Sequence, residues 1–216
     1  MARLIAVGDI HAQYYMLQDL LHKIKPNEAD KFVFLGDYID RGRYSKKVVD
    51  YLLDFDEKYN CVFLRGNHED MLLDYLELEQ KAKYGEAYLS NGGRKTIISY
   101  AGKMVNSAEF KNSIPEAHIQ FFLNTRDYYI EDNYLFVHAG VAPNKPLEKQ
   151  NRGDLLWIRD EFIYSPTTKL DKIVVFGHTP NQEVMLMKDK IGIDTGAGYN
   201  MHLSALELNS REVFTV

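Results

Sequence analysis

The amino-acid sequence predicts an α/β fold in which two mixed β-sheets pack as a sandwich flanked by helices. In the first third of the chain, short apolar runs alternate with longer segments whose apolar residues recur at helical spacing. In the second half, pairs of apolar runs flank turn residues, which is typical of β-hairpins. Both kinds of unit fit one molecule when two sheets share a core and helices cover their outer faces.

Three strand–helix units open the chain. The apolar runs RLIAVG, KFVFLG and NCVFLRG predict the strands, and the helices are expected over 12–24, 45–59 and 69–83. Ser45 is expected to cap the second helix at its N-terminus. Repetition of strand, loop and helix indicates a largely parallel sheet that is buried on both faces.

The pattern changes over residues 84–127. This segment contains a Gly-Gly pair and a short helix expected to begin near Pro115. We expect a small helical cap inserted between strands rather than a separate domain, so that residues 1–216 form a single domain.

The remaining segments predict a helix, a strand and three hairpins. Asp132 and Asn133 are expected in the turn of the first hairpin. The helix is expected over 154–164, the strand over 172–179, and the hairpins over 127–140, 183–196 and 203–216.

The composition is that of a soluble globular protein. The 216 residues are 45% hydrophobic and 26% charged, and the formal net charge of -5 gives no general attraction to nucleic acid or anionic membranes. Cys61 is the one cysteine and cannot form an internal disulfide, which fits a reducing compartment. The apolar runs are shorter than a membrane span, and the chain starts directly in a strand pattern, so a cytoplasmic protein without a signal peptide is expected.

Polar side chains that can bind metals follow five of the predicted strands, each beside a glycine. Ligands in open α/β sheets bind beyond the carboxyl ends of the strands, where glycine lets the backbone turn sharply. Any one of these residues alone is more often a turn cap or a packed histidine, and His22, His118 and His202, which lack the glycine, keep that interpretation. Together they would crowd like charges at one sheet edge, which predicts a cation. The residues are Asp9 and His11, Asp37 and Asp40, Asn67 and His68, His138, and His178.

The segments GDIH, GDYIDRG, GNHE, VHAG and GHT, in this order between Gly8 and Thr179, resemble the signature set of the calcineurin-like metallophosphoesterases. They are most similar to the branch that contains the phosphoprotein phosphatases and the symmetrical diadenosine tetraphosphate hydrolases. One departure is Ala12, where the family usually has glycine. The resemblance implies a four-layer α/β/β/α fold.

The resemblance also implies a dinuclear metal centre. Two divalent ions, manganese first and iron or zinc as alternatives, would activate a water for direct attack on phosphorus. Asp9 and His11 would bind the first ion, Asp37 would bridge both, and Asn67, His138 and His178 would complete the second.

The remaining implied roles concern the substrate. His68 would protonate the leaving group, with Asp40 orienting its ring. Arg41, Arg65 and Arg159 match positions that contact phosphate, a task suited to a planar and permanently charged group. A structural ion pair or a surface charge remains the alternative for Arg65 and Arg159.

Four functions compete on these residues. The leading prediction is a serine/threonine protein phosphatase acting on phosphoproteins or phosphopeptides. A symmetrical bis-nucleosyl-tetraphosphate hydrolase shares every metal ligand and would need exposed aromatic rings for base stacking. An inactive phosphate-binding scaffold is disfavoured because no ligand position is missing, and a nuclease because the chain is acidic. The aromatic candidates for stacking are Tyr84, Tyr88, Tyr100 and Tyr199.

Overall fold

The fold is a sandwich of two five-stranded mixed sheets. It is seen in a computed structural model that describes residues 2–79 and 85–216. In the first sheet three parallel strands continue into an antiparallel hairpin, in the order β10 (Val213–Thr215), β9 (Ser204–Glu207), β1 (Leu4–Val7), β2 (Lys31–Phe34), β3 (Asn60–Phe63). In the second sheet antiparallel strands lie at both edges, in the order β4 (Tyr128–Glu131), β5 (Tyr134–Val137), β6 (Ile173–Phe176), β8 (Lys190–Gly192), β7 (Met185–Leu186).

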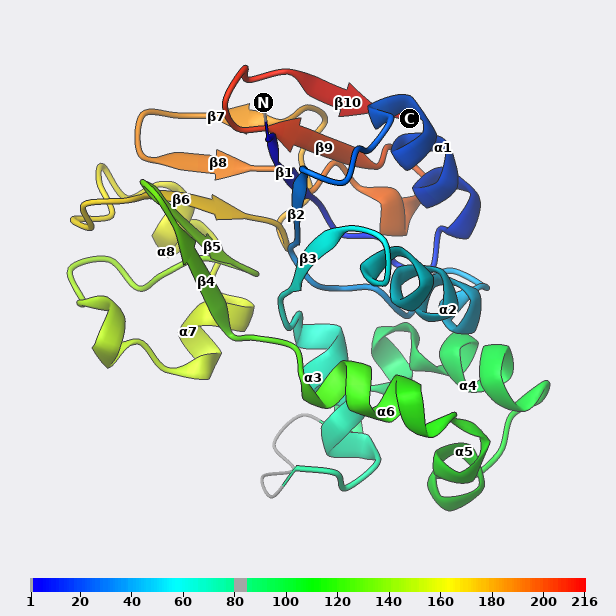
Figure 1. Cartoon of the computed structure of the whole chain (residues 1–216). Coiled ribbons are helices and arrows are strands. Elements are labelled where there is room, and N and C mark those ends of the chain that lie inside the picture. The colour runs from blue at the N-terminus through cyan, green and yellow to red at the C-terminus, as the bar shows by residue number, and fades with distance from the viewer. Residues whose placement is uncertain (1, 80–84) are drawn as a thin grey trace.

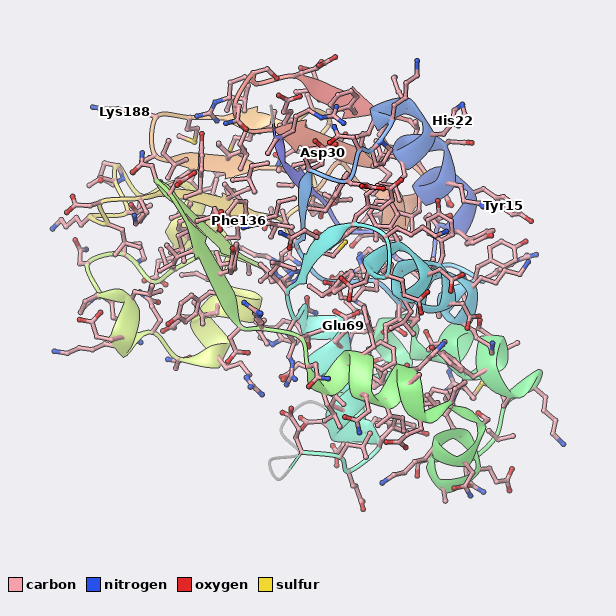
Figure 2. All side chains as sticks on the ribbon, viewed as in Figure 1. Tyr15, His22, Asp30, Glu69, Phe136 and Lys188 are labelled. Carbon is pink, nitrogen blue, oxygen red and sulfur yellow. The ribbon has the colours of Figure 1, made fainter. Side chains whose placement is uncertain are left out.

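Strand alternation divides the apolar side chains between three layers of core. In β1, Leu4 and Ala6 face the space between the sheets, whereas Ile5 and Val7 face the helices. Phe136 of β5, labelled in Figure 2, also belongs to the layer between the sheets. The sheets are therefore buried on both faces, as the sequence predicts.

Helices cover the outer face of each sheet (Figure 1). The apolar faces of α1 and α2 pack on the first sheet, and α7 and α8 pack on the second. A third helix, α3, begins directly at the end of the loop after β3. The bounds are α1 (Tyr14–Ile24), α2 (Ser45–Asp56), α3 (Asn67–Tyr75), α7 (Arg152–Trp157) and α8 (Asp160–Ile163).

The predicted cap over 84–127 corresponds to a run of helices that we call the helical insertion (residues 85–123); Tyr84 itself lies outside the described residues. The insertion packs beside α2 and α3, at the lower edge of the molecule in Figure 1. It contains η1 (Gly85–Ala87), η2 (Leu89–Gly93), α4 (Arg94–Ala101), α5 (Ser107–Ser113) and α6 (Glu116–Leu123). Pro115 precedes α6, as expected.

Three local predictions need correction. The helix expected over 154–164 is two helices, because the backbone at Arg159 (φ -134°, ψ -106°) leaves the helical region. The third helix ends at Tyr75 because Glu77 has a positive φ of 52°, and residues 80–83 of the expected helix lie outside the described residues. Ser45 is the first residue of α2, and its side chain makes no capping hydrogen bond there.

Within residues 2–79 and 85–216, every helix is too short or too polar to cross a bilayer.

Candidate metal centre

The loops that follow the parallel strands hold several non-glycine residues in the left-handed backbone region. His11, Asp37, Asp40 and His178 have φ values of 46°, 53°, 68° and 63°. Such conformations are unfavourable for residues with a Cβ and persist only where the surrounding structure enforces them. Because these strained residues are concentrated in the loops with metal-binding side chains, we infer that the loops are shaped by a functional site and not only by chain reversal.

Asp37 lies at the centre of the buried side chains. Its Oδ2 is 3.3 Å from Nε2 of His11, and its Oδ1 is 3.5 Å from Nε2 of His138. The side-chain oxygen of Asn67 is 3.0 Å from Nε2 of His138 and 2.9 Å from Nδ1 of His178. The structure therefore brings five of the six predicted ligands into one cluster, supplied by the segments that follow five different strands.

The hydrogen bonds of two histidines show which ring nitrogen carries the hydrogen. Nδ1 of His11 lies 3.1 Å from the carbonyl of Ile39, and Nδ1 of His138 lies 2.8 Å from the carbonyl of Leu35. A carbonyl can only accept, so both Nδ1 atoms carry the hydrogen and each neutral ring presents the Nε2 lone pair to Asp37. Burial lowers the pKa of His11 to about 3 and lowers that of His138. Neutral imidazole lone pairs facing a carboxylate suit a bound cation, and the carbonyl contacts are those that usually orient metal-binding histidines.

His178 adds an unpaired donor atom to the same cluster. Its Nε2 is buried and has no hydrogen-bond partner within the described part of the chain. Carboxylate, imidazole and amide oxygen donors without thiolate fit manganese, iron or zinc. Two groups of donor atoms close enough to hold an ion share Asp37: His11, Asp37 and His68, and Asp37, His138 and His178.

Asp9 lies behind this cluster and is held by the backbone of His178, whose N–H donates to both of its oxygens at 3.0 and 3.1 Å. A Cβ on Gly177 would lie 2.0 Å from the Asp9 carboxylate, so glycine is required there. Burial and the carboxylates of Asp194 and Asp37 raise the pKa of Asp9 well above its ordinary value. The crowding of three buried carboxylates again favours a cation, and the role of Asp9 as a direct ligand stays a prediction.

His68 and Asp40 form a fully buried pair beside the cluster, with Nδ1 of the ring 2.7 Å from Oδ2 of the carboxylate. Arg41 places a guanidinium nitrogen 3.2 Å from Nε2 of His68. Burial lowers the pKa of His68, but the carboxylates of Asp37 and Asp40 outweigh burial and raise it above its ordinary value. The pair therefore has the geometry of a positioned proton donor.

The other two predicted phosphate-binding arginines lie in different places. Arg159 is exposed at the start of α8. Burial is the main cause that lowers the pKa of His178, and the charges of His138 and Arg159 lower it further. The charge of Arg159 therefore acts on His178 from an exposed position, and its contact with phosphate stays a prediction.

Arg65 is directed away from the cluster and is only 2% exposed. Its guanidinium pairs with Glu79 at 2.6 Å, donates to the hydroxyl of Thr125 at 3.0 Å, and donates to the carbonyls of Phe122 and Leu123. We therefore correct its predicted phosphate contact to a structural ion pair, because these partners occupy its donors at the end of the helical insertion.

This correction predicts a stability defect rather than a binding defect. Arg65→Ala should lower the free energy of unfolding by on the order of 3 kcal/mol, because it leaves buried acceptors unpaired. Urea unfolding measures this loss, and inhibition by inorganic phosphate should be unchanged. The exposed Arg94→Ala is the matched control. A large loss of phosphate affinity in Arg65→Ala, at unchanged stability, would restore the original role.

Sequence reasoning missed Glu69, which supports the central loop. This fully buried carboxylate, at the start of α3 (Figure 2), accepts hydrogen bonds from the backbone N–H groups of Asp37, Tyr38 and Gly66 at 2.8 to 3.0 Å. It thereby fixes the left-handed backbone at Asp37. The signal was present, since Glu69 follows Asn67 and His68 directly.

Two further neighbours of the site are Asp194 and Tyr199. Asp194 is 5% exposed, and burial raises its pKa to about 6. It follows a strand and precedes a glycine, the same pattern as the predicted ligand loops, so the sequence could have revealed it. The ring of Tyr199 stacks 4.8 Å from the guanidinium of Arg41 and is 56% exposed.

Comparisons with known proteins agree with this arrangement. A bis(5'-nucleosyl)-tetraphosphatase of the asymmetrical type from Anoxybacillus flavithermus is 24% identical over 240 residues, which cover 97% of this chain and 92% of that protein. A solved structure named provisionally as a diadenosine tetraphosphatase has a TM-score of 0.72 at 22% identity and covers 100% of this chain and 93% of its own. A serine/threonine phosphatase structure from Saccharomyces cerevisiae has a TM-score of 0.65 at 15% identity, and the match covers 100% of this chain and 79% of that one.

The two structures share the fold with this chain. The family model for calcineurin-like phosphoesterases matches residues 2–207, which is nearly the whole sequence. The protein therefore belongs to the calcineurin-like phosphoesterase family.

Proposed function

We propose that this phosphoesterase is a dinuclear metal hydrolase that releases phosphate from phosphoserine and phosphothreonine in proteins. The observation that carries the dinuclear site is the sharing of Asp37 by two donor groups. Its two carboxylate oxygens face different histidines, so one residue can bind two ions at once. Manganese is the first candidate for both.

Two divalent ions in this cluster would polarise a phosphoryl group and activate a water to attack it. The chain's own residues supply the remaining roles in this proposal. Arg41 and Arg159 bind the non-bridging oxygens of the substrate phosphate. Once phosphate takes the guanidinium of Arg41, Nε2 of His68 is free to carry a proton to the leaving oxygen. Asp40 keeps Nδ1 of the ring protonated and the ring oriented.

The buried proton-donating pair supports a phosphoserine or phosphothreonine substrate. These esters release an alkoxide, a strong base that needs a proton as the bond to phosphorus breaks. Cleavage of a polyphosphate anhydride releases a phosphate oxygen, a far weaker base, and needs this help much less. His68 and Asp40 are both fully buried, and burial of such a pair contributes little net stability, so we assign the pair to the reaction rather than to the fold.

A dinucleoside polyphosphate remains the second candidate, and Tyr199 is the observation that favours it. Its exposed ring beside Arg41 is placed to stack on a nucleobase while the guanidinium binds phosphate. Of the other predicted stacking residues, Tyr88 is fully buried, Tyr100 bonds to His118, and Tyr84 lies outside the described residues. The related tetraphosphatase is named as asymmetrical. The second candidate is therefore an asymmetrical tetraphosphate hydrolase, in place of the symmetrical one that the sequence motifs suggested.

A substrate panel separates the two candidates. The manganese-loaded protein is assayed with a phosphoseryl peptide and with diadenosine tetraphosphate, and nucleotide products are separated chromatographically. Our proposal expects the larger kcat/KM on the peptide. Faster cleavage of the dinucleotide to ATP and AMP would establish the second candidate, and two ADP would indicate symmetrical cleavage. No turnover of either, or of simple aryl phosphates, would refute both.

Arg41 provides a separate test of phosphate binding. Arg41→Ala should raise KM and weaken inhibition by inorganic phosphate by about tenfold to a hundredfold, because charge-assisted hydrogen bonds are lost. Arg43→Ala is the matched control, since Arg43 lies in the same loop and is exposed. Equal phosphate affinity in the two variants would remove Arg41 from the substrate site.

A further inference from the structure

Three residues of the helical insertion lie against the loop that carries Asp40 and Arg41. Gly92 has a φ of +109°, and a Cβ there would lie 2.8 Å from the backbone nitrogen of Arg41. The side chain of Lys95 donates a hydrogen bond to the carbonyl of Arg41. Thr96, in the first turn of α4, reaches Asp40 itself. The insertion is therefore joined to the proton-donating pair by backbone and side-chain contacts.

The hydroxyl of Thr96 is fully buried and has a complete set of partners. It donates to Oδ1 of Asp40 at 2.5 Å and accepts the backbone N–H of Asp40 at 3.1 Å. The hydroxyl of Ser45, at 2.8 Å, is the third partner. The other oxygen of Asp40, Oδ2, is left for His68. Each carboxylate oxygen thus has its own partner, and the plane of the carboxylate is fixed.

We propose that Thr96 is a positioning residue for the reaction: its hydroxyl holds the Asp40 carboxylate in the orientation that keeps His68 directed at the leaving group. This inference rests on the proposed phosphoester hydrolysis. Without the hydroxyl, Oδ1 of Asp40 loses the hydrogen bond that it receives from Thr96, and the carboxylate is held less firmly in the plane that faces the ring. A residue of the helical insertion would then affect the rate of proton donation, although Thr96 lies more than fifty positions from Asp40 in the sequence.

The consequence is selective, because only a reaction that needs a proton depends on the ring. Release of 4-nitrophenolate, a weak base, needs little proton donation, whereas release of benzyl alcoholate needs much. A defect in the orientation of His68 should therefore appear in the second reaction and not in the first. A general loss of folding or of metal would lower both rates alike.

The test compares wild type, Thr96→Val and Thr96→Ser, each loaded with manganese, on 4-nitrophenyl phosphate and benzyl phosphate. Valine keeps the shape of threonine and removes the hydroxyl, and serine keeps the hydroxyl. We expect Thr96→Val to lose about tenfold to a hundredfold in kcat on benzyl phosphate and less than about twofold on 4-nitrophenyl phosphate. Thr96→Ser should recover most of the lost rate, and bound manganese should be equal in all three.

An unchanged ratio of the two rates in Thr96→Val, whether both rates fall equally or neither falls, would overturn the positioning role. Failure of the wild type to hydrolyse either ester is a different outcome, which refutes the proposed function and this inference with it. Activity in the wild type with no selectivity in Thr96→Val refutes the inference alone.

Discussion

Asp37→Asn should reduce phosphoester hydrolysis by more than about a thousandfold, because loss of one bridging carboxylate weakens the binding of both ions. An asparagine side chain has one oxygen and one NH2 group in place of two oxygens. It can therefore offer an oxygen to an ion on the side of His11 or on the side of His138, but not to both. Metal analysis after dialysis should show fewer than two equivalents of manganese per chain.

A neighbouring carboxylate should show the opposite effect in the metal-free protein. Burial and the charges of Asp194 and Asp37 raise the pKa of Asp9 well above its ordinary value, so removal of the Asp9 charge relieves an unfavourable burial when no cation is bound. Metal-free Asp9→Asn should therefore unfold at a urea concentration equal to or higher than metal-free wild type. Asp171→Asn, at an exposed carboxylate, should change neither property. Two full equivalents of manganese in Asp37→Asn would contradict the bridging role.

His68→Asn should keep the metals and lose turnover in proportion to the basicity of the leaving group. General acids typically contribute about a hundredfold to ten-thousandfold, so benzyl phosphate should lose this much in kcat and 4-nitrophenyl phosphate far less. The backbone N–H of His68, which donates to Asp37 at 3.1 Å, is preserved in this variant. Steady-state kinetics on the two esters measure the difference.

The control for this variant is His22→Asn, since His22 is exposed on α1, at the surface of the molecule (Figure 2). It should behave as wild type on both esters. Unchanged turnover of benzyl phosphate by His68→Asn would remove His68 from the mechanism. Loss of manganese would instead assign His68 to the first donor group, where its Nε2 lies 3.9 Å from Asp37.

The sheets and the donor cluster could be predicted because their signals are local. An apolar strand followed by a glycine and a polar side chain occupies fewer than ten residues, and parallel strands bring such ends to one edge. Asn67, for example, meets His138 and His178, although each belongs to a different loop. The same reasoning applied to Asp194 would have added it to the site.

The remaining features depend on contacts between distant segments, which local patterns do not encode. Arg65 immediately precedes a ligand loop, but its backbone pairs with Arg126 and its side chain follows toward Thr125. Thr96 lies in a segment whose sequence shows only Gly-Gly and a helix, and its partner is in another loop. The break at Arg159 likewise comes from the tertiary structure around α7 and α8, since the segment has no proline or glycine at that point.

The most direct test is a crystal structure of the protein grown with manganese, with anomalous diffraction recorded to locate the ions. We predict two manganese peaks, one on each side of the Asp37 carboxylate, with His11 bound to one ion and His138 and His178 to the other. A single peak, or peaks that do not contact Asp37, would contradict the dinuclear centre on which the proposed function depends.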